Sequence, residues 1–332
     1  MVEGALDVAA IGNAIVDVLA HTDDSLLAQI GVTKGVMTLI DASQAEAIYG
    51  ALPPAVECSG GSAANTVAGI ASLGGKTAFI GKVKNDQLGA VFRHDLTSLG
   101  VAFTTAPAND GPSTARCMVM VTPDAQRTMQ TYLGAAVELS PADVDAGHIK
   151  AAKITYLEGY LWDPPAAKQA MLKAAELAHA AGRKVALSLS DPFCVGRHRA
   201  EFLRLIDDHV DILFANEAEI TALYECDFDQ AMARAKDAVH IAAVTRGEHG
   251  SVAISGDTQV RVAAEKIQRL VDTTGAGDLY AAGFLFGLTR NHDLGVCARL
   301  GGICAAEVIS HMGPRPETNL ARLVADAQLL QA

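Results

Sequence analysis

Aromatic residues are scarce in this sequence, and clusters of basic residues are absent. Phe, Trp and Tyr make up 5% of the 332 residues, with a single Trp. The formal net charge is −12, and Lys and Arg form no dense run. Proteins that bind nucleic acid need a basic surface to neutralise the phosphate backbone. These absences argue against a nucleic-acid partner, and we expect a small-molecule partner instead.

Paired cysteines and long apolar segments are also missing. The six cysteines include no Cys-x-x-Cys pair, and no histidines cluster at zinc-ligand spacing. We therefore expect free thiols in a reducing compartment. No segment of about 20 residues is apolar throughout, as a membrane-spanning helix requires, and residues 1–12 lack the basic and apolar regions of a signal peptide. The sequence thus predicts a cytoplasmic protein without a membrane span.

The remaining composition fits a large globular domain. Hydrophobic residues make up 50% of the chain and charged residues 19%, which is ordinary for such a domain. From residue 154 onward, β-prone runs alternate with helical segments, at residues 154–157, 185–189, 212–214 and 241–244. This alternation predicts an α/β fold in which helices cover both faces of a mostly parallel sheet. We predict a single domain over residues 1–332, with an antiparallel edge hairpin at 251–254 and 260–262.

A different pattern occupies residues 101–134. This segment contains β-prone runs at 115–122 and 127–132 and no helical pattern between them. Similar short runs occur around residues 14–22 and 35–40. Together these segments predict a small β-sheet that projects from the main domain.

Polar and acidic residues follow several predicted strands. In an open α/β sheet, ligands bind beyond the carboxyl ends of the strands. The residues in these positions are Ser190 and Asp191, then Asn216, Glu217 and Glu219, and then Thr245, Arg246 and Gly247. The same residue types also form helix caps and turns. Taken singly, each of them fits either interpretation.

The most specific segment is DTTGAGD at residues 272–278, which leads into an apolar helix. Glycines at a helix start let the backbone approach an anion, and the first-turn N–H groups have no intrahelical partner. Gly275, Ala276 and Gly277 are positioned to supply such groups. Asp278 beside them fits a base that takes a proton from a hydroxyl attacking a phosphoryl group. An Asp in a first turn can also be a cap, but the whole pattern is more specific than that.

Two other nucleotide-binding motifs are excluded. Gly75, Lys76 and Thr77 resemble the end of a P-loop, but Ile70 stands where that motif needs a further glycine. The order of elements there is helix and then strand, which is the reverse of a P-loop. No Gly-x-Gly-x-x-Gly follows the first predicted strand, at 6–11, which argues against a dinucleotide-dependent oxidoreductase.

Three motifs resemble one known family. GGSAAN at 60–65, continuing to Leu73 and Gly74, resembles the N-terminal signature of the PfkB carbohydrate kinases, and residues 272–278 resemble the C-terminal one. NEAE at 216–219 matches the family's Asn-x-x-Glu element. The resemblance covers essentially the whole chain. It implies a ribokinase-like fold, in which a small β-sheet lid comes from segments around 14–22, 35–40 and 101–134.

The resemblance also implies an ATP-dependent kinase that uses Mg²⁺; the need for a monovalent cation is left open. Asp278 would be the catalytic base, and Gly275, Ala276 and Gly277 would form the anion hole. Asn216 and Glu219 would order Mg²⁺, largely through water. The implied ATP site consists of Asn216, Thr245, Arg246, Gly247, Thr274, Gly275 and Gly277.

The implied acceptor site resembles the adenosine kinase branch of the family. Its hydroxyl-binding residues would be Asn13, Asp17, Gly61, Ser62 and Asn65. GNAIVD at 12–17 and LSDPF at 189–193 resemble segments of that branch, and so does the lid region around Arg127. Tyr160 and Phe193 would supply flat apolar walls for a base, although both could also be ordinary core aromatics.

The expected activity is transfer of the ATP γ-phosphate to a primary hydroxyl, most simply the 5′-hydroxyl of adenosine. Ribose, fructose or a related sugar is the alternative acceptor, because ribokinases share the early Asn and Asp. A non-catalytic nucleotide-binding regulator is a more remote alternative, since the base and the glycines are all present. Monomer and homodimer both remain open. His311 and Arg315 are interpreted as residues near a helix end and are not assigned to the site.

Overall fold

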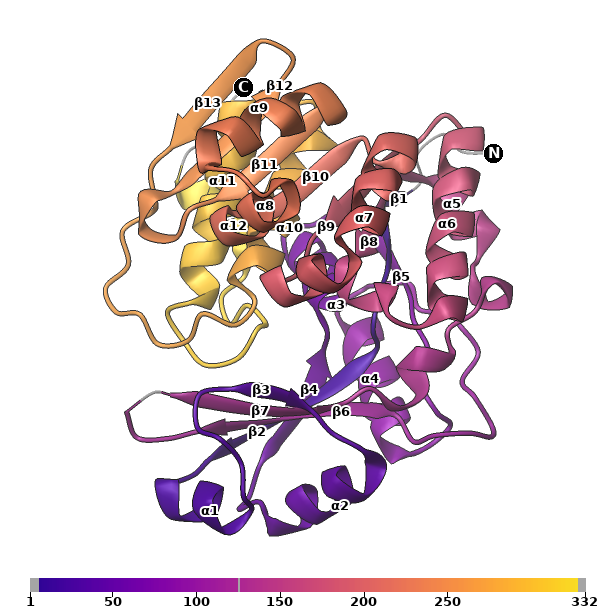
Figure 1. The fold of residues 1–332 in the computed structure, drawn as a ribbon, viewed down its shortest axis with the longest axis vertical. Helices are drawn as coiled ribbons and strands as arrows, with labels where there is room; N and C mark the ends of the chain where they lie inside the picture. Colours follow the sequence, from indigo (N-terminus) through magenta and orange to yellow (C-terminus); the bar gives the residue numbers. More distant parts are fainter. Residues whose placement is uncertain (1–5, 125, 328–332) are drawn as a thin grey trace.

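The computed structural model describes residues 6–124 and 126–327 (Figure 1). These residues form an eight-stranded sheet with the order β13-β12-β11-β10-β9-β8-β1-β5. From β5 to β11 all neighbours are parallel, and β12 and β13 add an antiparallel hairpin at one edge, as predicted. The strand bounds are β1 (Leu6–Ile11), β5 (Thr77–Ile80), β8 (Ala152–Glu158), β9 (Lys184–Ser188), β10 (Ile212–Asn216), β11 (Ile241–Thr245), β12 (Ser251–Ser255) and β13 (Thr258–Val262).

Helices cover both faces of this sheet, because alternate side chains of the central strands are buried on opposite sides. In β1, Val8 and Ala10 belong to one apolar core, whereas Ala9 and Ile11 belong to the other. The first core includes α3 (Ser62–Ser72), α4 (Gln87–Ser98), α10 (Ala276–Leu288), α11 (Leu294–Val308) and α12 (Leu320–Asp326). The second includes α5 (Ala146–Ala151), α6 (Pro165–Ala180), α7 (Pro192–His209), α8 (Glu217–Tyr224) and α9 (Phe228–Ala238). The sequence prediction of the α/β class is confirmed.

A second, small sheet lies beside the main domain (Figure 1). Its strand order in the described residues is β3-β7-β6-β2-β4. Helices α1 (Asp24–Gln29) and α2 (Ala42–Ala51) cover its outer face, where Leu27 and Ile48 pack with Val18 and Met118. The strand bounds are β2 (Ile15–His21), β3 (Met37–Leu39), β4 (Val56–Gly60), β6 (Ala115–Val121) and β7 (Arg127–Tyr132).

The small sheet differs from the sequence expectation in two places. Strand β4 was not predicted, because its sequence VECSG has little of the β-branched and aromatic character of a strand. The segment before Ala115 does not join the small sheet. Instead, Ala102 and Ala108 form isolated bridges with Ala78 and Lys84, next to the edge of the main sheet.

Several local predictions agree with the structure. Gly74 ends α3 with φ +88°, and Gly75 donates to the carbonyl of Ile70, so the segment that resembles a P-loop is a helix end. Asp41 caps α2 in a capping box with Gln44. All six cysteines are free thiols. Among the described helices, none is long and apolar enough to cross a membrane.

Helices α10 and α11 approach each other closely through glycines. A Cβ atom at Gly283 would lie 2.4 Å from the carbonyl oxygen of Leu300, and one at Gly301 would lie 2.7 Å from that of Tyr280. Both obstacles are backbone atoms, which cannot rotate away. The close packing of α10, which begins at the predicted anion hole, therefore depends on these glycines.

We predict that Gly283→Val lowers the free energy of unfolding by about 1–3 kcal/mol or more, because the added methyl groups force the two helices apart. Urea denaturation of the purified variant measures this change. Gly50→Ala, at an exposed helical position with open space around it, is the control and should be neutral or slightly stabilising. Equal stability of both variants would contradict this account.

Candidate functional site

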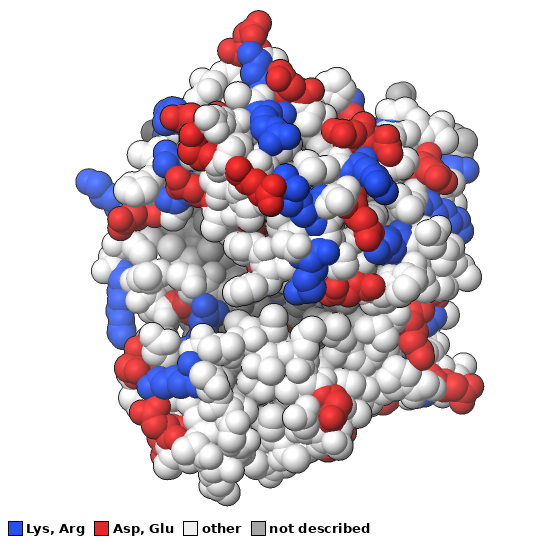
Figure 2. Space-filling model, in the orientation of Figure 1, with Lys and Arg blue, Asp and Glu red and all other residues white. Residues whose placement is uncertain are grey.

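The candidate site lies at the edge of the main sheet where its parallel strands end. Figure 2 shows the surface hollowed here, between the main domain and the small sheet. Residues predicted for the site come together at this edge. Asn216 and Thr245 end β10 and β11 and are paired in register, while Asn13 follows β1 and Ser190 follows β9. Helices α3 and α10 also begin at this edge, and side chains in their first turns are hydrogen-bonded to each other.

The side chain of Asp278 connects the starts of two helices. It lies in the first turn of α10, and its Oδ1 accepts a hydrogen bond from Ser62 Oγ at 2.6 Å. Its Oδ2 accepts from Asn65 Nδ2 at 2.8 Å. Burial raises the pKa of Asp278, while these two hydrogen bonds and the positive charge of Arg315 oppose that rise. The sequence prediction grouped Ser62, Asn65 and Asp278 in one site, and the structure brings them into contact.

The loop before α10 is held in a specific turn. Gly275 has φ +78° in the left-handed region, and a Cβ there would lie 2.9 Å from Pro314. Asp272 Oδ1 accepts from the Thr274 N–H and hydroxyl at 2.8 and 2.7 Å, and its Oδ2 accepts from Gly313 N–H at 3.0 Å. Asp272 thereby fixes the loop that presents the first turn of α10.

The three predicted anion-hole residues have different surroundings in this turn. The N–H of Ala276 donates to the carbonyl of Thr273 at 3.3 Å. The space around a Cβ at Gly277 is open, as the approach of an anion to the backbone requires. Gly277 is therefore better placed than Ala276 to present its N–H group to an anion.

Asp17 lies on strand β2 of the small sheet, near enough to Asp278 for the two charges to interact. Its carboxylate packs against Gly60, where a Cβ would lie 2.2 Å from Asp17 Oδ2. Burial raises the pKa of Asp17 to about 7; Arg315 opposes this rise, and the charges of Asp278 and Asp272 add to it. The neighbouring Gly61 has φ +92° and would place a Cβ 2.3 Å from the Asn13 carbonyl oxygen. Both glycines are required for this close approach.

Glu158, at the end of β8, was not among the predicted site residues. Its Oε1 accepts from the side-chain and backbone N–H groups of Asn13 at 2.7 and 3.3 Å, and its Oε2 accepts from Ala63 N–H at 2.8 Å. Burial raises its pKa to about 7. Asn13 is thus held by Glu158 and linked to the start of α3. Inspection of residues after strand ends could have found Glu158, because it directly follows the buried run at 154–157.

One face of the small sheet is turned toward the loop at 272–278. Arg127 on β7 pairs with Asp272, with Nη1 2.8 Å from Oδ1, and donates to Thr273 Oγ1 at 3.0 Å. The sequence prediction placed Arg127 at the substrate, whereas here it is engaged with this loop. Since strand side chains alternate between faces, the residues that share this face with Arg127 can be read from the register.

The open face of the small sheet combines a polar row with an apolar row. Paired residues across neighbouring strands lie on the same face. The row that contains Asp17 consists of Leu39, Thr131, Cys117, Asp17 and Cys58. The next row consists of Met37, Met129, Val119, Leu19 and Val56. Met37 and Leu39 are 42% and 52% exposed, so apolar side chains remain accessible on the face that carries Asp17.

The predicted metal-binding pair forms a helix cap. Asn216 and Glu219 make a reciprocal capping box, in which Glu219 Oε1 accepts from Asn216 Nδ2 at 2.6 Å and Oε2 accepts from Asn216 N–H at 2.9 Å. Burial raises the pKa of Glu219 to about 7, and the charges of Asp191 and Asp278 add to the rise. No ion pair of the described residues includes Glu219. A buried carboxylate without a cationic partner fits a hydrated Mg²⁺.

A direct metal cage is not formed. Across residues 6–124 and 126–327, no three His, Cys, Asp or Glu side chains gather in a metal-binding group. Mg²⁺ retains much of its water shell in proteins. The pair Asn216 and Glu219 could hold such an ion only through its water molecules, and their role in metal binding stays a prediction.

The remaining residues predicted for ATP lie beyond β11. Arg246 forms a two-pronged ion pair with Glu217, with both N···O distances 2.9 Å, and its guanidinium lies 4.1 Å from the ring centre of Phe228. Arg246 is thus paired with protein groups in this structure. Gly247 follows with φ +55° and begins the short 3₁₀ helix η4 (Gly247–His249).

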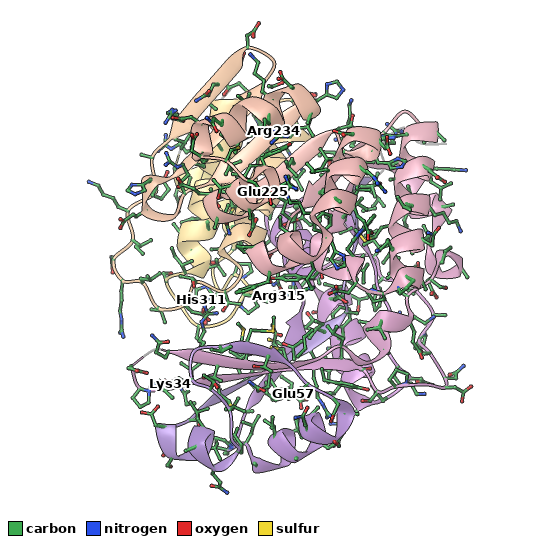
Figure 3. All side chains as sticks on the ribbon, viewed as in Figure 1. Lys34, Glu57, Glu225, Arg234, His311 and Arg315 are labelled. Carbon is green, nitrogen blue, oxygen red and sulfur yellow. The ribbon has the colours of Figure 1, made fainter. Side chains whose placement is uncertain are left out.

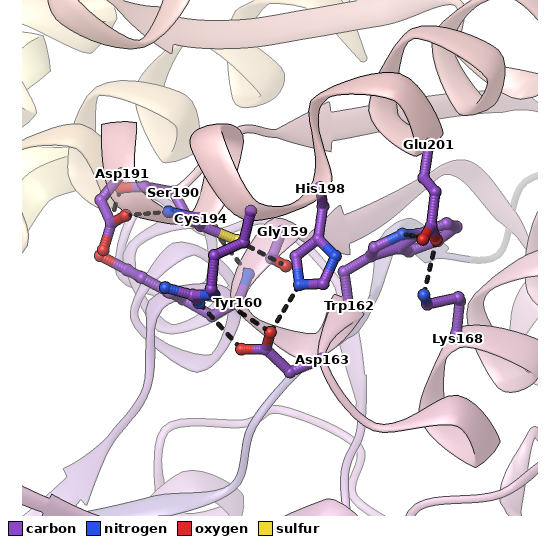
Figure 4. Close-up of polar contacts among 11 residues, drawn as sticks. Gly159, Tyr160, Trp162, Asp163, Lys168, Ser190, Asp191, Cys194, His198 and Glu201 are labelled. Carbon is purple, nitrogen blue, oxygen red and sulfur yellow. Dashed lines mark hydrogen bonds and ion pairs between the residues drawn. The ribbon is translucent and has the colours of Figure 1, made fainter. Parts of the chain in front are cut away.

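Tyr160 and Phe193, the two predicted walls of the acceptor pocket, have different surroundings. Tyr160 lies on η3 (Gly159–Trp162), where its N–H donates to Ser190 Oγ at 3.0 Å and its hydroxyl donates to the Ser190 carbonyl at 3.3 Å (Figure 4). Ser190 has φ +73°, a strained value for a residue other than glycine. Phe193 is 80% exposed. Phe193 is therefore not a core aromatic, and it does not enclose a pocket in this conformation.

A charged cluster supports the helix that carries Phe193. Helix α7 has a kink at His198, with φ −119° and ψ 15°. Asp163 Oδ1 lies 2.5 Å from His198 Nε2, and Asp163 Oδ2 accepts from Arg197 at 2.9 Å (Figure 4). The cluster fixes the kinked first turns of α7 against the segment that follows Tyr160.

Arg315 was left unassigned in the sequence interpretation but reaches the site. Figure 3 shows it in the region between the main domain and the small sheet. It donates to Ser59, at the end of β4, and to Ala64 in α3. No local sequence pattern indicates this position, because the residue follows an irregular loop. His311, by contrast, lies beside Glu307 of α11, with Nε2 3.2 Å from Oε2.

Known proteins are similar to this chain in sequence and in fold. The profile of the pfkB family carbohydrate kinase matches residues 36–320. The structure of adenosine kinase from Sinorhizobium meliloti superposes with a TM-score of 0.91 at 53% identity, over 97% of this chain and 99% of that chain. The probable sugar kinase from Rhizobium etli CFN 42 superposes with a TM-score of 0.92 at 49% identity, over 98% and 99%. The 5-dehydro-2-deoxygluconokinase of Shouchella clausii is 30% identical over 76% of this chain and 80% of its own length. The ribokinase-like architecture predicted from the motifs is confirmed.

We predict that Glu219 makes stability depend on pH when Mg²⁺ and nucleotide are absent. Its pKa rises from 4.5 to about 7 on folding, so its contribution is fully present below pH 4.5 and is lost as the pH rises through 7. Wild type should therefore lose about 3 kcal/mol relative to Glu219→Gln between pH 4.5 and pH 8, at about 1.4 kcal/mol per pKa unit. Urea denaturation at both pH values measures the difference.

The control for this prediction is the neighbouring Glu217. Gln retains the capping box at position 219, so that variant isolates the charge. At position 217 the Arg246 guanidinium lowers the pKa of the carboxylate, so Glu217→Gln should give no change or a change of the opposite sign. The prediction would be contradicted if the difference in unfolding free energy between wild type and Glu219→Gln stayed constant across this pH range.

Proposed function

Because this chain belongs to the pfkB family of carbohydrate kinases, we propose that it transfers the γ-phosphate of ATP to the 5′-hydroxyl of adenosine. The observation that carries the proposal is the position of Asp278. Its carboxylate is held by Ser62 and Asn65, directly after Gly277 in the first turn of α10. A carboxylate at an anion-binding helix start fits a base that acts on a hydroxyl beside a phosphoryl group.

Asp278 is the general base of the proposed reaction. A carboxylate has about four lone-pair sites, so two remain for an incoming hydroxyl after the bonds from Ser62 and Asn65. The acceptor oxygen forms a bond to the γ-phosphorus, the bond from that phosphorus to the bridging oxygen of ADP breaks, and the hydroxyl proton passes to Asp278. Most of the rate comes from positioning and charge stabilisation.

The start of α10 holds the transferring phosphoryl group. We assign the N–H groups of Gly275 and Gly277 to its binding, and the helix dipole favours its negative charge. Asn216 and Glu219 would hold the water shell of Mg²⁺, which would supply charge neutralisation at the ATP phosphates. Closure of the small sheet over the hollow excludes water, which suppresses hydrolysis of ATP.

The open face of the small sheet supports a nucleoside as acceptor. Asp17 accepts hydrogen bonds from ribose hydroxyls, and Asn65 and the turn at Gly61 lie beside it. The apolar row that contains Leu19, Met129 and Met37 offers contact to a flat base, which a free sugar does not need. The 53% identity to an adenosine kinase over nearly the whole chain agrees with this choice.

We predict that Asp278→Asn lowers kcat for adenosine phosphorylation by about 10²–10⁴-fold, because Asn cannot accept the hydroxyl proton. A coupled assay of ADP release measures turnover. Asn retains acceptor and donor groups for Ser62 and Asn65, so unfolding temperature and ATP affinity should stay close to wild type. Turnover within a few-fold of wild type would contradict the role of Asp278.

A substrate panel tests the acceptor. We expect kcat/KM for adenosine to exceed that for ribose or fructose by at least about 10²-fold, because only a nucleoside uses both the polar and the apolar row. The assay compares these acceptors at saturating ATP and Mg²⁺. Efficient phosphorylation of ribose or fructose without turnover of adenosine would instead establish a sugar kinase, the alternative that the relatives' names also raise.

A further inference from the structure

Arg315 is a partly buried arginine that bonds to the segments next to the acidic residues of the site. Its Nε donates to the Ser59 carbonyl at 2.9 Å and its Nη2 donates to Ser59 Oγ at 2.9 Å. Its Nη1 donates to the Ala64 carbonyl at 2.6 Å. The guanidinium therefore spans the turn at residues 60–61 and bonds to both of its ends. None of these partners is a carboxylate, and within residues 6–124 and 126–327 Arg315 forms no direct ion pair.

Both reactive carboxylates depend on the turn that Arg315 spans. Asp17 packs against Gly60, one residue after Ser59. Asp278 accepts from Ser62 and Asn65, which flank Ala64 in α3. One guanidinium thus fixes the backbone that supports both acids and places its positive charge beside them.

We propose that Arg315 is the counter-cation of the site, which keeps Asp17 and Asp278 deprotonated together and positions the turn on which both rely. This proposal rests on the proposed function, since it requires Asp278 as the base. Arg315 does not touch the reacting atoms; it is a positioning and electrostatic residue that acts through the two carboxylates.

The charges around the site explain why such a cation is needed. Other titratable groups also face this region from several elements: the acids Asp95, Asp272, Glu158 and Glu219, the thiols Cys58 and Cys117, and the phenols Tyr156 and Tyr160. Neighbouring carboxylates in a buried site resist ionising together. Arg127 is already paired with Asp272, whereas the Arg315 charge lowers the pKa of both Asp17 and Asp278. An arginine stays charged at every working pH.

Asp95 extends the network on the other side of Ser59. Its Oδ2 accepts from Ser59 N–H at 2.8 Å and from Ser59 Oγ at 2.6 Å. Its negative charge partly offsets that of Arg315. Asn could still accept these two bonds, so Asp95→Asn changes the charge around Arg315 while leaving the turn in place.

The experiment is the pH profile of kcat/KM, whose acidic limb reports the ionisation of the acid pair in the free enzyme. In Arg315→Met the raised pKa of the base keeps it protonated over a wider range. The acidic limb should therefore move to higher pH by about one unit or more. At a pH on or below the limb, kcat/KM should fall about tenfold, and at higher pH it should fall less. Arg315→Lys restores the charge without the three-pronged geometry, so its limb should return toward wild type while kcat stays reduced.

Arg93 provides a matched control. It also donates to two backbone carbonyls, those of Phe103 and Thr105, at 2.8 and 2.6 Å, outside the site. Arg93→Met removes an equivalent structural arginine, and its acidic limb should not move. A uniform loss of activity at all pH values in Arg315→Met, with an unmoved limb, would show a merely structural role and overturn the proposal.

Asp95→Asn keeps the proposal testable if Arg315→Met does not fold. Without the opposing charge, Arg315 should stabilise the ionised acids more strongly, and the limb should move to lower pH. An unmoved limb, or one moved upward, would contradict the proposal. Retained activity in Asp278→Asn would instead show that the proposed base is wrong, so the two failures are distinguishable.

Discussion

The carboxylate of Asp278 joins two helix starts that are far apart in sequence. Its partners Ser62 and Asn65 lie 216 and 213 residues away along the chain. Helices α3 and α10 can meet this closely because Gly69 allows Leu279 and Ala282 to approach α3. The proposed site depends on this one contact, since it sets the distance between the turn assigned to the phosphoryl group and the residues assigned to the acceptor hydroxyl.

Buried acids are the second constraint. Asp17, Glu158 and Glu219 are all nearly inaccessible, and burial raises each of their pKa values to about 7. Such a site is costly while it is empty, because buried carboxylates without cations resist ionisation. In the proposed function a bound Mg²⁺ would supply positive charge beside Glu219, so its binding would be linked to the protonation of that acid.

The small sheet connects the acceptor site to the phosphate site. Asp17 and Arg127 lie on the same face of this sheet, and Arg127 is bound to Asp272 in the loop before α10. A movement of the sheet that changes the position of the acceptor therefore also acts on the loop that presents the anion-binding amides. The same face carries the exposed apolar side chains of Met37 and Leu39, which the proposed function assigns to contact with a base.

The features that depend on local backbone chemistry could be predicted from the sequence alone. The alternation of strands and helices, the helix end at Gly74 and the turn around Gly275 all follow from the conformational limits of a few neighbouring residues. The family resemblance of residues 60–65 also placed Ser62 and Asn65 in the acceptor site. The partners of the buried charged groups, by contrast, are visible only in the tertiary structure. The contacts of Glu158 with Asn13 and of Arg315 with Ser59 and Ala64 join distant segments, because the hydrogen-bonding partners of a buried charged group depend on which segments the fold brings near it.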